Sequence, residues 1–225
     1  KSSLLSENDN VYIQGYSVGA WLGYDFAGID PKTGHTLAYA EDGTKVDMDM
    51  FNNRTLALKR PPMHYLGEGY PTTTGGFATE FRYKQWELNA QFEFQTGHLI
   101  PTISSTMNHN YNYSGNRYIA DQYRWRAVGD VAERPYLGIN NTAYDQYRFN
   151  TSLEKGDYLR CTYTSLGYRL TEELCKKLSV RSARIAITAS NLFTLTNFKG
   201  IDPASMGTLS YPSTRTYSIT LNVGF

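Results

Sequence analysis

The chain has 225 residues, a net charge of +1 and a mean hydropathy of -0.49. Its length allows a single domain, and the absence of any run of about 20 apolar residues excludes membrane-spanning helices. The near-neutral charge gives no electrostatic reason to expect nucleic acid as a partner.

The first alternating stretch covers residues 16–26, in which even positions are apolar and odd positions are small or polar except Trp21. A β-strand points successive side chains to opposite faces, so this pattern predicts a strand with one apolar face. Residues 28–76 lose the pattern and contain turn sequences at 29–34 and 41–44. We expect a loop of about 48 residues here, a length typical of functional loops or inserted domains.

Residues 77–83 and 86–94 alternate with opposite parity on the two sides of Lys84-Gln85. A change of parity across two residues is what a tight hairpin produces, because both strands must keep their apolar side chains on one face. The stretch therefore predicts two strands joined by a short turn. A second long polar segment, rich in Asn and Tyr, follows from 98 to 156.

Residues 156–170 alternate again but change parity within the stretch, which predicts a strand with a bulge near Thr164 or Ser165. A connection at 171–182 leads to a strand at 183–193, and a loop then leads to the end of the chain. The terminal strand, residues 216–225, has one wholly polar and one wholly apolar face. Its apolar positions, which would face lipid if the strand crossed a membrane, are Tyr217, Ile219, Leu221, Val223 and Phe225.

The pattern predicts six strands, whose connections are in order long, short, long, moderate and moderate. Such connections fit an outer-membrane β-barrel in which the long segments are extracellular and the Lys84-Gln85 turn and Phe225 are periplasmic. The 19 Tyr, 10 Phe and 19 Gly fit the aromatic girdles and tight turns of such a barrel. Six strands are too few to close one, and an open sheet edge in lipid is costly. We therefore expect an all-β chain that is the C-terminal part of a larger barrel.

Several short motifs follow one another in a specific order, namely Gly15–Gly19, Gly28–Gly34, Gly75–Phe77, Phe81–Lys84, Arg124-Trp125, Gly129-Asp130, Gly156–Arg160, Asn191–Thr194 and Gly200–Pro203. This order resembles the C-terminal end of SusC/RagA-type TonB-dependent transporters of Bacteroidetes outer membranes. The resemblance runs from about Val11 to Phe225. It implies a barrel of about 22 strands with an N-terminal plug, energised by TonB and capped by a SusD-like lipoprotein that delivers glycans or peptides. We expect the plug and the remaining strands to lie outside this chain.

The sequence offers no pattern that points to an enzyme or a cofactor. His35, His64, His98 and His109 lie in loops or at a strand end without metal-binding spacing, and no nucleophile elbow or phosphate-binding glycine loop is present. Cys161 and Cys175 fall too far apart on the predicted elements for a disulfide, so we expect free thiols. The expected partners are the lipid bilayer, a SusD-like lipoprotein, the TonB complex and an oligosaccharide or peptide substrate.

The two long loops are the functional candidates, because tyrosine rings can stack on a polar ligand while asparagine amides bond to it. The candidate contact residues are Tyr111, Tyr113, Tyr118, Asn110, Asn112, Tyr144 and Tyr147. Loop packing, against other loops or the lipoprotein, explains the same tyrosines equally well. A passive or structural barrel, or a soluble glycan-binding β-domain, remains the alternative to an importer.

Overall fold

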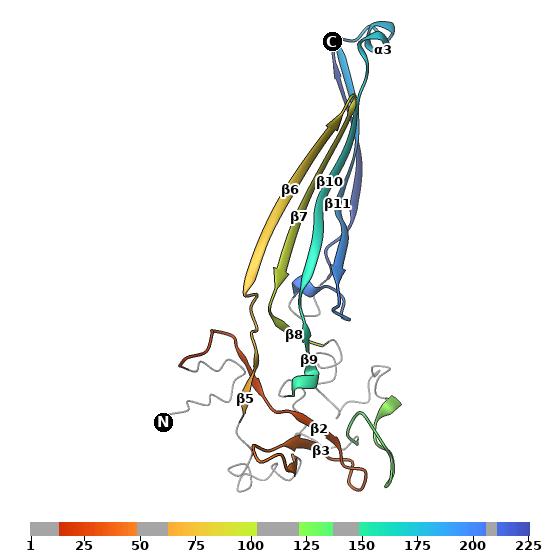
Figure 1. Cartoon of the computed structure of the whole chain (residues 1–225). Coiled ribbons are helices and arrows are strands. Elements are labelled where there is room, and N and C mark those ends of the chain that lie inside the picture. The colour runs from red at the N-terminus through yellow and green to blue at the C-terminus, as the bar shows by residue number, and fades with distance from the viewer. Residues whose placement is uncertain (1–13, 49–62, 103–121, 137–148, 206–210) are drawn as a thin grey trace. The chain divides into compact units, whose positions relative to one another are not determined.

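The computed structural model describes residues 14–48, 63–102, 122–136, 149–205 and 211–225. The chain divides into two compact units, each assembled from segments that are far apart in the sequence. Unit 1 comprises Lys1–Tyr70, His98–Lys155 and Lys199–Leu209, and unit 2 comprises Pro71–Gly97, Gly156–Phe198 and Ser210–Phe225. Most of the secondary structure is antiparallel β (Figure 1), which confirms the predicted all-β class.

Unit 2 is a five-stranded antiparallel sheet with the strand order β12-β11-β10-β7-β6. Its strands are β6 (Thr73–Tyr83), β7 (Trp86–Thr96), β10 (Tyr158–Arg169), β11 (Ser182–Thr196) and β12 (Thr216–Gly224). Each has between 9 and 15 residues, long enough for a tilted strand to cross a bilayer. Five of the six predicted strands are therefore confirmed, and they lie side by side in one sheet (Figure 1).

The β6–β7 hairpin has the predicted two-residue turn. Tyr83 pairs with Trp86, and Lys84 adopts a left-handed backbone with φ of 53°. A positive φ at the first turn residue matches the right-handed twist of the flanking strands, which is why such short turns need it. The apolar residues on both sides of the turn consequently share one face of the sheet.

The predicted irregularity in β10 is present, between Cys161 and Tyr163, two to three residues before the predicted position. Relative to β7, one additional residue is accommodated in β10 at this point. A second irregularity follows in β11, where Asn191 has φ of 52° and the register with β10 shifts again. Bulges of this kind change side-chain parity and increase twist without ending the strand.

The connection between β10 and β11 contains a short helix, α3 (Glu172–Lys177). Glutamates begin it and lysines end it, in the arrangement that favours the helix dipole, and the buried Cys175 anchors it. Cys161 and Cys175 are free thiols, as predicted. In the part of the chain that the structure describes, no helix is long and apolar enough to cross a membrane.

The predicted barrel strand at residues 16–26 is wrong. Ala20 N–H donates to the carbonyl of Ser17 in a turn, β1 (Trp21–Gly23) is only three residues long, and a separate strand begins at Phe26. β1 pairs with β5 (His64–Gly67), and both belong to unit 1. Gly19, inside the predicted stretch, has φ of 81°, which interrupts the extended backbone that the alternation suggested.

The segment 28–76 is not the single loop that we predicted, because it contains a small sheet of its own. The strands β2 (Phe26–Ile29), β3 (Thr36–Tyr39) and β4 (Lys45–Asp47) pair in that order. The predicted turn sequences join them. Asp30 accepts hydrogen bonds from Lys32 N and Thr33 Oγ1 in the first turn, and Asp42 accepts them from Thr44 in the second.

The segment 98–156 also carries regular structure where we predicted a loop. β8 (Leu99–Pro101) pairs with β9 (Leu153–Lys155), and a short 3₁₀ turn, η4 (Asn150–Ser152), precedes β9. A further 3₁₀ turn, η5 (Pro203–Ser205), lies in the last segment of unit 1.

The core of unit 1 forms around Tyr24, Ala38, Met48 and Phe149, which are all at most 5% exposed. Asn150 holds the neighbouring backbone, since its side-chain oxygen accepts from Phe26 N and its amide donates to Asp25. These contacts join residues more than 120 positions apart in the sequence.

Residues 122–136 pack on the β2–β3 turn of unit 1. Trp125 Nε1 donates to the carbonyl of Pro31, and Tyr136 N–H donates to that of Gly34. Gly34 has φ of 75°, and a β-carbon there would lie 2.6 Å from the Trp125 ring. Glycine is therefore required at this position for two reasons, the positive φ of its backbone and the close approach of the Trp125 indole.

Candidate functional site

The terminal strand β12 pairs with β11 along its whole length. Tyr217, Ile219, Leu221 and Val223 lie opposite Ala189, Ile187, Ile185 and Ala183. These four apolar residues and Phe225 are exposed, with exposed fractions from 40% to 87%. The polar residues of the strand point to the other face, as the period of two predicts.

The apolar face of β12 continues across the whole sheet. The strand registers place on this face Phe77, Phe81 and Tyr83 of β6; Trp86, Leu88, Ala90, Phe92 and Phe94 of β7; Leu159, Cys161, Leu166 and Tyr168 of β10; and Ala183, Ile185, Ile187, Ala189, Phe193 and Leu195 of β11. We call this surface the apolar face. From Trp86 to Phe94 it spans about 27 Å along the strand, or about 20 Å in height at a tilt of about 40°.

The two bulges keep this face continuous. Phe92 of β7 lies opposite Cys161, and Cys161 lies opposite Phe193. Without the inserted residues in β10 and β11, the apolar side chains of these two strands beyond the bulges would point to the opposite face of the sheet. Bulges thus explain why apolar residues change from odd to even positions within β10 while remaining on one surface.

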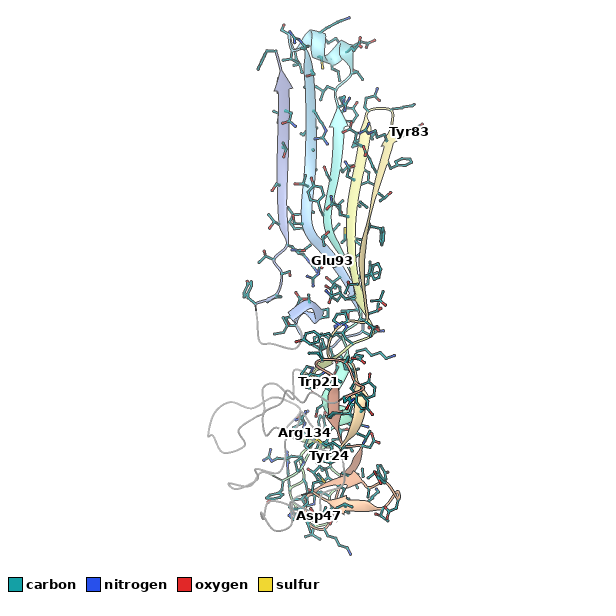
Figure 2. All side chains as sticks on the ribbon, turned by 90° about the vertical axis from the view of Figure 1, so that its left-hand side faces the viewer. Trp21, Tyr24, Asp47, Tyr83, Glu93 and Arg134 are labelled. Carbon is teal, nitrogen blue, oxygen red and sulfur yellow. The ribbon has the colours of Figure 1, made fainter. Side chains whose placement is uncertain are left out.

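Aromatic side chains gather towards both ends of the apolar face. At the turn end, Trp86 and Tyr168 meet edge to face with ring centroids 4.9 Å apart, and Lys84 Nζ lies 5.4 Å from the centroid of the Tyr83 ring. Towards the other end, Phe77 stacks on Phe92 at 4.8 Å. Figure 2 shows Tyr83 at the turn end, with its ring directed away from the sheet. Two aromatic belts bordering an apolar band are the pattern of a transmembrane barrel wall.

The opposite face of the sheet, which we call the polar face, carries an ion-pair cluster near the turn end. Glu87 lies between two arginines, accepting from Arg169 Nη2 at 2.5 Å and from Arg184 Nε at 3.1 Å. The three residues come from β7, β10 and β11, so the cluster joins three strands. Arg184 also lies beside Gly167, where a β-carbon would meet the guanidinium at 2.6 Å.

A second polar cluster surrounds Arg160, which is only 5% exposed. Its guanidinium donates to Thr194 Oγ1 at 3.1 Å and to Ser213 Oγ at 3.0 Å, and it lies 3.8 Å from the Glu93 carboxylate. The Tyr158 ring lies beneath it, at 5.2 Å. Arg160 therefore fixes the segment before β12 against the polar face. Glu93 of β7, which lies beside Arg160, is labelled in Figure 2.

The loop residues chosen from the sequence cannot be compared with the structure. Tyr111, Tyr113, Tyr118, Asn110, Asn112, Tyr144 and Tyr147 lie outside the residues that the structure describes. Their contact with ligand or partner stays a prediction. Within the described ranges, no group of three or more His, Cys, Asp or Glu side chains has the arrangement of a metal site.

Unit 1 contains an exposed aromatic cluster that the sequence did not indicate. Tyr16 and Tyr65 stack with ring centroids 5.2 Å apart and an interplanar angle of 27°. Tyr65 Oη donates to Glu68 Oε1 at 2.8 Å, and Ser17 Oγ donates to Glu68 Oε2. The hydrogen bond to Glu68 raises the pKa of Tyr65 above its ordinary value of 10.0. No local pattern links residues 49 positions apart, so sequence reasoning missed this pair.

Comparisons with known proteins agree with this geometry. No family model matches the chain. It is 23% identical to TonB-dependent receptor P3 of Formosa agariphila over 98% of this chain and 23% of that receptor. It is also 24% identical to TonB-dependent receptor P26 of the same bacterium, over 71% of this chain and 18% of that receptor.

Solved structures of the RagAB peptide transporter share the fold. One matches with a TM-score of 0.76 and 24% identity over 98% of this chain and 24% of that chain. Another, in the 'open-open' state, matches with a TM-score of 0.73 and 23% identity over 99% of this chain and 24% of that chain. The chain thus spans about a quarter of the length of these relatives.

The sheet has one apolar and one polar face, aromatic belts border the apolar face, and the fold matches these relatives. These features define the class of the protein as part of an outer-membrane β-barrel. The resemblance to SusC/RagA-type TonB-dependent transporters is confirmed over nearly the whole chain.

Proposed function

We propose that the chain is the C-terminal part of the barrel of a TonB-energised importer of oligomeric nutrients, either glycans or peptides. The observation that carries this proposal is the apolar face, which continues across five strands and both bulges of a single sheet. A soluble domain of this size would bury such a face against a second layer. In a barrel wall, the same face contacts lipid and the polar face lines the lumen.

The positions of the connections support the proposed orientation. The two-residue turn after Tyr83, the α3 connection and Phe225 lie at one end of the sheet, and the segments 97–157 and 197–215 leave from the other. Outer-membrane barrels have short periplasmic turns and longer extracellular loops. The α3 end therefore belongs in the periplasm and the segment containing Tyr111 and Tyr144 outside the cell.

The partners follow from the same class. TonB engages the complete protein through regions outside this chain, and a SusD-like lipoprotein covers the extracellular loops and delivers substrate. The name of the solved relatives, a peptide importer, supports peptide as one substrate class. TonB-dependent receptors are named for energised transport, which favours active import over a passive barrel.

The proposal is tested by uptake in the native host. Deleting the gene should abolish uptake of a fluorescent oligopeptide or oligosaccharide that the strain normally imports, and the full-length gene should restore it. A protonophore should block the restored uptake within minutes. Uptake that continues with the protonophore would favour the passive barrel, and full-length protein that stays in solution without detergent would favour a soluble domain.

The extracellular candidates are tested in the same assay. Replacing Tyr111, Tyr113 and Tyr118 together with alanine should reduce uptake without lowering the amount of protein in the outer membrane, because these positions fall outside the residue bounds of the five strands of the sheet. A triple variant that keeps parental uptake and parental capture of the lipoprotein would show that these tyrosines only pack the loop.

A further inference from the structure

The stacked tyrosines of unit 1 form a two-segment platform. Tyr16 comes from the turn before β1, and Tyr65 comes from β5, which pairs with β1. The exposed fraction of the surface is 50% for Tyr16 and 38% for Tyr65. Stacking covers one side of each ring, so an accessible ring surface remains available to a ligand.

Two hydroxyl groups hold the Glu68 carboxylate beside this platform. Tyr65 Oη donates to one of its oxygens and Ser17 Oγ to the other. Among the residues that the structure describes, no Lys, Arg or His forms an ion pair with Glu68. Within the described ranges, its negative charge is therefore oriented by neutral donors and not compensated by a cation.

The surrounding segments keep this arrangement in place. Trp21 Nε1 donates to the carbonyl of Leu99 at 2.8 Å, and Leu99 N–H donates to the carbonyl of Glu68 at 2.7 Å. Gly19, with φ of 81°, lies against the Tyr70 ring, where a β-carbon would be 2.4 Å from the nearest ring atom. The backbone around Glu68 is thus contacted by two other segments, the turn at Gly19 and β8 at Leu99.

We propose that Tyr16, Tyr65 and Glu68 bind an organic cation, the guanidinium or ammonium group of a basic side chain. The faces of aromatic rings attract cations, and a carboxylate at the rim accepts hydrogen bonds from a guanidinium. A neutral sugar would donate hydroxyl hydrogen bonds to Glu68 but would leave its charge uncompensated, whereas a cation compensates that charge. The inference deepens the proposed function, on which it rests for the source of the cation: a basic peptide substrate or a basic side chain of the surface partner.

The binding test uses purified full-length protein in detergent and two peptides with acetylated N-termini and amidated C-termini, Ala-Arg-Ala and its uncharged isostere Ala-citrulline-Ala, with affinity measured by calorimetry. The arginine peptide should bind roughly fivefold or more tightly than the citrulline peptide, as exposed cation–π and ion-pair contacts together predict. Glu68→Gln and Tyr16→Ala should each abolish the preference. Glu41→Gln, which removes an exposed carboxylate from the β3–β4 turn, should keep it.

Equal affinity for the two peptides, or a preference that survives Glu68→Gln, would overturn the site whatever the result of the uptake assay. Two further measurements on Glu68→Gln identify the source of the cation. Reduced uptake of the arginine peptide, with normal capture of the lipoprotein, assigns the site to substrate. Reduced capture of the lipoprotein assigns it to the partner, and loss of neither in the cell would overturn a role for the site in import.

Discussion

An arginine on the apolar face of β12 offers the sharpest test of membrane contact. Leu221 lies mid-strand, four residues before Phe225, and opposite Ile185. That spacing is about 13 Å along the strand and about 10 Å in depth at a tilt of about 40°, which is close to the middle of an apolar band about 25 Å tall. Leu221→Arg should therefore lower the free energy of unfolding by about 2–4 kcal/mol.

Two matched substitutions on the same strand give the expected gradient. Val223→Arg lies nearer the periplasmic end and opposite Ala183, so it should cost less, about 1–2 kcal/mol. Thr220→Arg points to the polar face and should cost under about 1 kcal/mol. Depth must be measured along each strand from its own end, because β12 continues past the level of the β6–β7 turn (Figure 1).

The assay is a urea titration of the full-length barrel in phospholipid vesicles, in which unboiled samples report the folded fraction by gel mobility. The order of destabilisation should be Leu221→Arg, then Val223→Arg, then Thr220→Arg. Equal costs for Leu221→Arg and Thr220→Arg would refute the assignment of the two faces. A larger cost for Val223→Arg than for Leu221→Arg would refute the depth that we assign to the strand.

Three other predictions concern the terminus, the bulge and the tyrosine cluster. Deleting Phe225 should lower the amount of full-length protein in outer-membrane fractions, because β12 is an edge strand of the described sheet and Phe225 extends its exposed apolar row; normal abundance would contradict this. Asn191→Val should destabilise the barrel by about 1–2 kcal/mol in the urea titration, because the φ of 52° disfavours a β-branched residue, whereas Asn191→Gly should be milder; equal costs would exclude backbone strain. In an NMR titration, Glu68→Gln should lower the pKa of Tyr65. The hydrogen bond of Tyr65 stabilises the fold fully below pH about 10, and this stabilisation is lost as the pH rises through the raised pKa. An unchanged pKa of Tyr65 in the variant would show that Glu68 does not cause the shift.

The long strands of unit 2 could be predicted from the sequence because their signal is local. Alternation with a period of two, as in Thr216–Gly224, states which side chains share a face without knowledge of the partner strand. The change of parity across Lys84-Gln85 identified the hairpin for the same reason, and the parity change within β10 revealed its bulge to within two or three residues. The orientation of the short and long connections followed from these strands.

The tertiary structure decided what depends on distant partners. The alternation of residues 16–26 resembled a barrel strand, yet Gly19 interrupts it and β1 pairs with β5, more than 40 residues away. The Tyr16–Tyr65 stack and the joining of Glu87 to Arg169 and Arg184 likewise exist only after strands from separate segments align. Side-chain parity is a property of each strand by itself, but register and contact are properties of pairs, and the chain reveals its pairs only when it folds.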